Sequence, residues 1–149
     1  MEVVLKMSHA SAESAADVMA LLGWLPADRR VVSVALAGAG NMNLVERVTL
    51  DNDTTVILKR ARGWVEKYPD IPAPIERAEV EAAFYTAVAD SAAGRAMPTH
   101  LGFSKAAAAN LIADLGEGTD GMSAYSGKSI SDDALDAIAD WMLALHGLE

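Results

Sequence analysis

The chain has 149 residues, of which 52% are hydrophobic and 22% charged, so it is long enough to form one domain with a buried core. Its 21 acidic residues outnumber its 12 basic residues and give a net charge of -9. This balance argues against a nucleic-acid-binding surface, because phosphate backbones are bound by an excess of Lys and Arg. The sequence contains no cysteine, which excludes disulfides, zinc-thiolate sites and cysteine nucleophiles together.

The N-terminal stretch MEVVLKMSHA does not resemble a secretion signal, because it lacks a basic start followed by a continuous apolar segment. No run of about 18 apolar residues, the length needed to span a bilayer, occurs in the sequence. We therefore expect a cytoplasmic protein whose partners include neither a membrane nor a nucleic acid.

The first predicted element is a helix over 11–22. Apolar side chains recur there at the spacing of one helix face, and Gly23 follows where a glycine commonly ends a helix. β-Branched residues then dominate the sequence, and the Asp-Asn-Asp triplet at 51–53 has the composition of a turn. This texture predicts three consecutive antiparallel strands over 31–38, 43–50 and 54–61.

Three prolines fall within 62–74, which predicts a loop or an extended connection. Pro74 suits the first turn of a helix that runs to about Ala89. Two short strands are predicted next, over 100–105 and 110–115, joined by an alanine-rich turn.

A glycine-rich connector over 116–127 leads to the last predicted element. Ser131 is expected to cap a helix over 132–146, whose acidic first turn complements the helix dipole. The predicted fold class is therefore α+β, with a five-stranded antiparallel sheet and a packed helix, preceded by one helix and followed by another.

Gly38 and Gly40 lie in the stretch ALAGAGNMNLVERVTL, where glycine lets backbone N–H groups approach a phosphate. A dinucleotide-binding fingerprint would need a third glycine and then a helix, but Asn43 takes that position and a strand pattern follows. No Gly-Lys-Ser/Thr follows the glycines, so a Walker A loop is excluded as well. A β-hairpin over phosphates is the better interpretation, and a dinucleotide-binding oxidoreductase domain remains an alternative.

The predicted order is strand, glycine turn, strand, turn, strand with an inward lysine, and then a helix rich in Glu. This is the order found in the small lobe of protein-kinase-like phosphotransferases. Four segments, LAGAGNMNLVERV, VILKRA, IERAEVEA and NLIADL, resemble the N-terminal lobe of the aminoglycoside phosphotransferase and choline kinase superfamily. Within it they look most like methylthioribose kinases, whose loop also has Gly-x-Gly-Asn-x-Asn character. The resemblance covers roughly residues 12 to 146.

The resemblance implies an ATP site with three parts. The glycine turn would cover the phosphates, Lys59 would contact the α and β phosphates, and backbone groups of the 112–115 hinge would read the adenine edge. The nucleotide-binding residues implied in this way are Gly38, Gly40, Asn41, Asn43, Lys59, Glu81, Ala113, Asp114 and Leu115.

Lys59 is a charge on a strand otherwise suited to burial, so it needs a carboxylate partner. Glu76, Glu79 and Glu81 compete for this role. Alignment with the family's helix favours Glu81, whereas helix geometry alone leaves Glu76 nearly as good. The alternative is a solvated helix face on which Glu81 pairs with Arg77 at i, i+4.

The resemblance also implies a division of the chain into an N-terminal lobe, residues 1–115, and a hinge connector with the first helix of a C-terminal lobe, residues 116–149. In this family the acceptor-positioning aspartate and the Mg²⁺ ligands come from the C-terminal lobe. We therefore expect no catalytic or metal-binding residue in this chain, and Mg²⁺ only where a C-terminal lobe is supplied.

The expected function is the nucleotide-binding lobe of an ATP-dependent small-molecule phosphotransferase, with a sugar-, aminoglycoside- or choline-type substrate, inactive by itself. The alternative is a non-catalytic interaction module that self-associates through its exposed lobe face.

Overall fold

Five antiparallel strands form the central sheet, in the order β1-β2-β3-β7-β6. The structure is a computed structural model, and it describes residues 12–38, 40–118 and 121–147. The strands of this sheet are β1 (Val31–Leu36), β2 (Asn43–Leu50), β3 (Thr55–Ala61), β6 (His100–Ser104) and β7 (Ala109–Ala113). No parallel pair occurs in this sheet, so the predicted antiparallel architecture is confirmed for the described residues.

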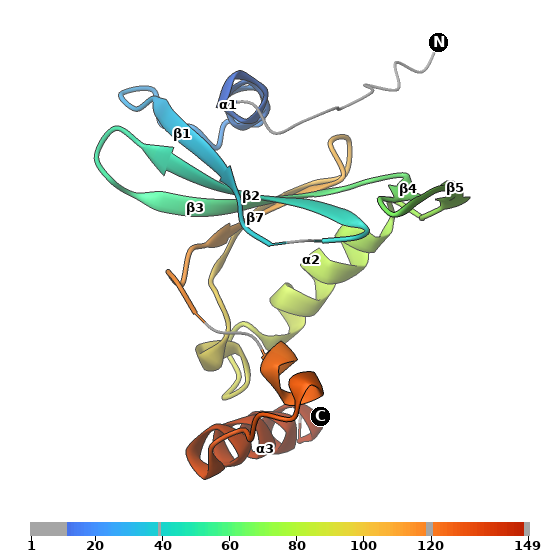
Figure 1. Ribbon diagram of the computed structural model, residues 1–149. Helices are drawn as coiled ribbons and strands as arrows, with labels where there is room; N and C mark the ends of the chain where they lie inside the picture. Colours follow the sequence, from blue (N-terminus) through green and yellow to red (C-terminus); the bar gives the residue numbers. More distant parts are fainter. Residues whose placement is uncertain (1–11, 39, 119–120, 148–149) are drawn as a thin grey trace.

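Helices lie on both faces of the sheet (Figure 1). Helix α1 (Ala12–Leu21) covers one face, and α2 (Arg77–Val88) crosses the other. Helix α3 (Asp132–His146) lies beyond α2, at the end of the molecule away from the sheet. Two 3-10 turns complete the helical elements, η1 (Gly94–Ala96) and η2 (Gly121–Ser126).

The core lies on both faces of the sheet. Strand β2 alternates strictly, and its buried side chains all face the α1 side. On the α1 side, Met19 packs on a cluster that includes Val48 and Leu58, both fully buried. On the α2 side a smaller cluster forms from Ile57, Tyr85 and Ile112, with three partly buried side chains packed against it: Ala37, Val45 and Met97.

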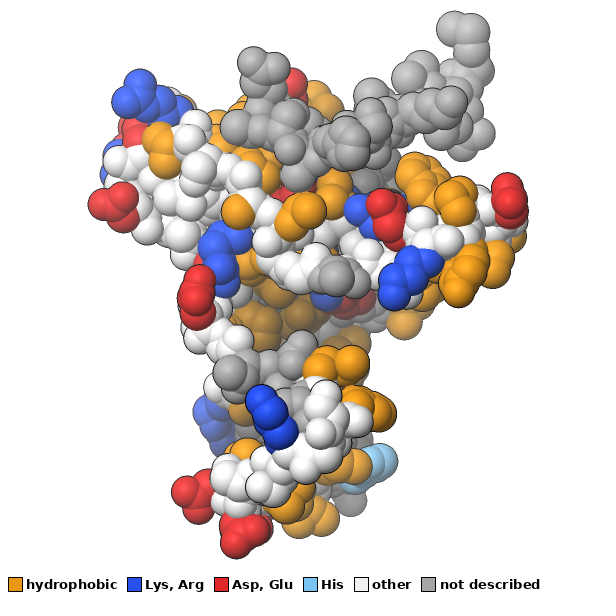
Figure 2. All heavy atoms as spheres, in the orientation of Figure 1, with side chains coloured by type: hydrophobic (Ala, Val, Ile, Leu, Met, Phe, Trp, Pro, Cys, Tyr) orange, Lys and Arg blue, Asp and Glu red, His pale blue; other side chains and the backbone are white. Residues whose placement is uncertain are grey.

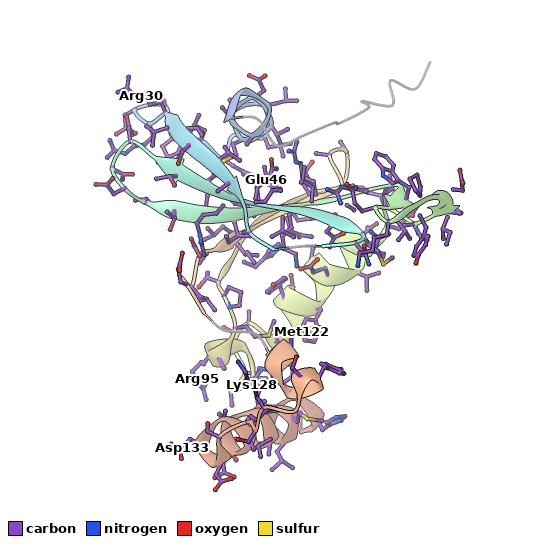
Figure 3. The ribbon with its side chains drawn as sticks, in the orientation of Figure 1. Arg30, Glu46, Arg95, Met122, Lys128 and Asp133 are labelled. Carbon is purple, nitrogen blue, oxygen red and sulfur yellow. The ribbon has the colours of Figure 1, made fainter. Side chains whose placement is uncertain are left out.

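A buried ion pair lies among the apolar side chains on the α1 side of the sheet. Glu46 of β2 accepts a hydrogen bond from Arg60 of β3, and both residues are almost completely buried. Figure 3 shows Glu46 on the sheet beneath α1. Burial of such a pair requires both partners, because removing one would leave an uncompensated charge in the core.

The segment 62–74 is not simply a loop, as the prolines suggested. It contains a second, two-stranded sheet of β4 (Trp64–Val65) and β5 (Tyr68–Pro72). Pro69 and Pro72 are tolerated because β5 has only one neighbouring strand. A residue of such an edge strand can lack its N–H without breaking a hydrogen bond of the sheet.

The start of α2 also differs from its prediction. The helix begins at Arg77, after Glu76 at the N-cap, and not at Pro74. The carbonyl oxygen of Pro74 accepts a hydrogen bond from the Arg77 side chain instead of a helical N–H. The other predicted elements lie within one or two residues of their observed bounds, except that Ser11, in the first predicted helix, lies outside the described residues and that the glycine-rich connector contains η2.

Helix α3 has the predicted cap but little burial. The Ser131 hydroxyl accepts a hydrogen bond from the N–H of Ala134, and none of the helix residues is buried. The indole N–H of Trp141 donates to the carbonyl of Ala93 at 3.1 Å, which attaches the helix to the segment after α2. Apolar side chains gather over this helix and over the β4–β5 end of the molecule (Figure 2). None of the helices in the described ranges is long and apolar enough to cross a bilayer.

Candidate functional site

Lys59 forms the centre of the candidate site. It lies on β3, in register with Val45 of β2 and Asn110 of β7, and its side chain faces α2. The ammonium group forms an ion pair with the carboxylate of Glu81, and the two side chains are 22% and 23% exposed. The expected pairing of Lys59 with Glu81 is therefore confirmed.

The other two glutamates of α2 lie elsewhere. Glu79 pairs with Lys105 at 2.9 Å on the surface, and Glu76 is the exposed N-cap residue. The i, i+4 pair of Arg77 with Glu81 is not formed, because Arg77 donates to the backbone before α2 and to the glycine turn. Helical geometry explains the choice, since Glu81 is next to the buried stripe of α2 and Glu79 is not.

The glycine turn, residues 37, 38 and 40–42, joins β1 to β2. The N–H of Ala37 donates to the carbonyl of Val45 at 2.9 Å, which closes the hairpin. Gly38 has a φ of 118°, a backbone conformation that side chains disfavour. At Gly40 a Cβ atom would lie 2.6 Å from the carbonyl oxygen of Asn43. The backbone therefore requires glycine at both positions, as the sequence pattern predicted.

Three carbonyl groups of this turn, those of Gly40, Asn41 and Met42, accept hydrogen bonds from the β4–β5 segment and α2. Gly40 accepts from the Arg62 side chain at 3.2 Å, and Asn41 accepts from the N–H of Glu66 at 2.7 Å. Met42 accepts from the backbone N–H of Arg62 at 3.0 Å. A guanidinium group of α2 also donates to Met42, at 2.9 Å.

The N–H groups of the same three residues, Gly40, Asn41 and Met42, unlike their carbonyl groups, have no partner among the described residues. A turn with engaged carbonyls and free N–H groups is a local concentration of hydrogen-bond donors, which suits an anion. Asn41 is exposed, whereas the side-chain oxygen of Asn43 accepts from Arg77 at 3.2 Å.

The predicted hinge follows β7. Ala113 ends the strand, and its N–H donates to the carbonyl of Thr99 at 2.8 Å. Leu115 is 73% exposed, and its N–H donates to no described residue. Leu115 follows three residues after Ile112, which belongs to the apolar cluster on the α2 side of the sheet.

The carboxylate of Asp114 is occupied within the protein. It accepts two hydrogen bonds from Arg47 of β2, at 2.6 and 3.2 Å, and one from the N–H of Gly116 at 2.9 Å. The bond from Arg47 lowers the pKa of Asp114 below its ordinary value of 3.8, although burial opposes this shift. Arg47 also donates to the carbonyl of Gly116 at 2.9 Å. Arg47 and Asp114 together therefore hold the backbone of the hinge at Gly116.

A further polar network connects α2 to the sheet. Asn110 of β7 is 1% exposed, and its side-chain amide donates to the carbonyl of Ala78 at 2.9 Å. Its oxygen lies 2.9 Å from Nε2 of His100, which must carry the proton because the amide oxygen can only accept. The His100 ring stacks on Tyr85 of α2, with centroids 5.0 Å apart. Burial raises the pKa of Tyr85 above its ordinary value of 10.0.

Sequence reasoning missed four of these residues: Arg47, Arg62, Arg77 as a contact of the turn, and Asn110. The one signal that could have found Asn110 is its polar side chain at the start of an otherwise apolar strand. The arginines carry no comparable signal, because each looks like a surface residue until its distant partner is known.

The described residues contain no group of three His, Asp or Glu side chains placed to hold a metal ion. A scan against protein-family models finds no matching family, and a search of curated proteins finds no matching sequence.

Proposed function

We propose that this domain binds ATP and serves as the nucleotide-binding lobe of a small-molecule phosphotransferase of the aminoglycoside phosphotransferase and choline kinase type. The observation that carries the proposal is the placement of the Lys59–Glu81 ion pair one strand away from a turn whose N–H groups at 40–42 donate to no described residue. Such a pair holds a cation ready for a phosphate, and the turn supplies neutral donors for the phosphate oxygens.

The remaining parts of the domain fit a nucleotide. The apolar surface around Ile57, with Ala37 and Val45 packed against it, offers a place for a flat adenine ring. The N–H of Leu115, which donates to no described residue, is available to one edge of that ring. Mg²⁺ would arrive with the phosphates, and in the resembled family its ligands come from a second lobe. We therefore propose that this domain binds the nucleotide without transferring phosphate on its own.

Calorimetry with MgATP tests the proposal. Lys59→Met should weaken binding about tenfold to a hundredfold, the usual loss for a charge-assisted hydrogen bond. Lys105→Met is the matched control, because it also removes an ion pair to a glutamate of α2, on the solvent side. The control should bind as the wild type does. A wild-type chain that does not bind ATP, or equal affinities for the two variants, would refute the proposal.

A second candidate, a module that self-associates, is favoured by the apolar side chains of α3. Four of them are about half exposed or more: Leu135, Ile138, Met142 and Leu143. Exposed apolar surface of this kind promotes association. Light scattering at increasing protein concentration tests this candidate, and a monomer throughout the range would count against it.

A further inference from the structure

Arg77 connects α2 to the glycine turn. It is the first residue of the helix, and its guanidinium group donates to three acceptors. One is the carbonyl of Pro74, just before the helix. The other two lie at the end of the glycine turn and the start of β2: the carbonyl of Met42 at 2.9 Å and the side-chain oxygen of Asn43 at 3.2 Å.

One helical turn separates this contact from the one at Lys59. Arg77 and Glu81 are four residues apart, so they lie on the same side of α2. The helix therefore holds the glycine turn through Arg77 and the β3 lysine through Glu81. These are the two parts of the site proposed to contact phosphate.

We propose that Arg77 is a positioning residue that fixes the glycine turn to α2 and so presets its N–H groups for the phosphates of the nucleotide. This inference rests on the proposed ATP binding. The guanidinium group is suited to the task because its planar fork can bridge several acceptors at once, which an ammonium group cannot do in the same geometry.

The electrostatics of the turn support this role. A carbonyl oxygen close to a bound phosphate would repel it, and the positive guanidinium group engages that of Met42. On the other side Arg62 engages the carbonyl of Gly40 and is itself paired with Glu66 at 2.9 Å. A turn held in this way loses less entropy when a ligand binds, which strengthens binding without a new contact.

Coupling between the two phosphate contacts follows from the same geometry. Displacement of α2 would move Glu81 away from Lys59 and Arg77 away from the turn together. Binding of phosphate at the turn should, by linkage, also stabilise the position of α2. Through Arg77, the affinity for the triphosphate should therefore depend on the position of α2.

The test compares Arg77→Lys and Arg77→Met with Arg95→Met by calorimetry, using MgATP and adenosine as separate ligands. Arg95 is the matched control because it is an exposed arginine in η1, at the end of the molecule away from the sheet (Figure 3). We expect both Arg77 variants to bind MgATP about tenfold more weakly and to bind adenosine as the wild type does. The control should bind both ligands normally.

Hydrogen exchange without nucleotide gives a second, independent measurement. The amide hydrogens of the peptide covering residues 40–46 should exchange faster in both Arg77 variants, and their exchange rate should be unchanged in the control. Asn43→Ala removes one acceptor without altering α2, and combined with Arg77→Lys it should cause less than the sum of the two single losses.

Distinct results would overturn the inference. Normal MgATP affinity in Arg77→Lys would mean that only the charge matters, while the proposed function would stand. Equal losses for MgATP and adenosine would indicate a general structural defect, as would exchange that rises throughout the chain. Absence of MgATP binding by the wild type would refute the proposed function and this inference with it.

Discussion

Individual side chains in this domain are held by partners that lie far away in the sequence. Arg47 and Asp114 are 67 residues apart, yet Arg47 donates two hydrogen bonds to the Asp114 carboxylate at the hinge. Lys59 and Glu81 are 22 residues apart, and Glu46 and Arg60 form their pair inside the core. Of these charges, Glu46 and Arg60 are almost completely buried, so an unpaired charge there would be costly and the fold depends on their pairing.

Asp114 should make the stability of the domain depend on pH. Its pKa is lowered in the folded state by the hydrogen bond from Arg47, whereas the unfolded chain has the ordinary value of 3.8. The contact therefore stabilises the fold above the unfolded pKa, and this contribution is lost as the pH falls through the folded pKa. Asp114→Asn should lower the free energy of unfolding near neutral pH.

The measurement is urea denaturation at about pH 7 and about pH 3. The difference between wild type and Asp114→Asn should shrink at the lower pH, because Asp114 of the unfolded chain binds a proton below its ordinary pKa of 3.8 while the lowered pKa of the folded state opposes protonation. Asp28→Asn is the control, since Asp28 is 74% exposed and its pair with Arg29 contributes little. A difference that stays constant between the two pH values would contradict the prediction.

Helix α2 is the element on which the candidate site depends. It supplies Glu81 to the lysine and Arg77 to the glycine turn, and its carbonyl at Ala78 accepts the bond from the buried Asn110. The helix is fixed at its start by the glycine turn and by Asn110 of β7, and further along by the stacking of Tyr85 on His100 of β6. Its end is fixed by close packing of the segment that leads to β6.

Gly94 tests the packing at the end of α2. A Cβ atom at this position would lie 2.0 Å from the carbonyl oxygen of Val88, the last residue of the helix. Because the obstacle is backbone, Gly94→Ala should lower the free energy of unfolding by about 2–3 kcal/mol.

Thermal or urea denaturation provides the measurement, and Gly63→Ala is the matched control. No atom lies within 4 Å of a Cβ placed on Gly63, so its free energy of unfolding should change by less than about 1 kcal/mol. Similar stabilities of the two variants would show that the end of α2 can shift to accept a side chain.

The molecule as a whole consists of a sheet with helices on both faces and a third helix that adds little to the core. None of the residues of α3 is buried, whereas α1 contributes Ala15 and Met19 to the main cluster. The predicted division between residues 1–115 and 116–149 leads us to expect that the sheet and the first two helices fold without α3.

A chain shortened to end at Gly118 should therefore keep the fold. Its circular dichroism should show a cooperative thermal transition within a few degrees of that of the full chain, and its MgATP affinity should be unchanged. The shortened chain retains Arg47, Asp114 and Gly116, so the hinge contacts remain. Loss of cooperative unfolding would mean that the Trp141 contact with the segment after α2 is essential.

The local features of this fold could be predicted from the sequence. Strand alternation, the Ser131 cap and the glycines of the turn depend on residues within a few positions of one another, and all were found as expected. The carboxylate partner of Lys59 could be narrowed to three glutamates of one helix, because a charge on a buried strand must be paired.

The remaining features required the three-dimensional arrangement. Selection of Glu81, the contact of Arg47 with Asp114 and the attachment of Arg77 to the glycine turn all join elements that local patterns treat separately. The β4–β5 hairpin was missed because strand pairing can tolerate prolines on an edge that the sequence does not reveal. Periodicity tells which side of an element faces the core, but only packing brings a given side chain within hydrogen-bonding distance of its partner.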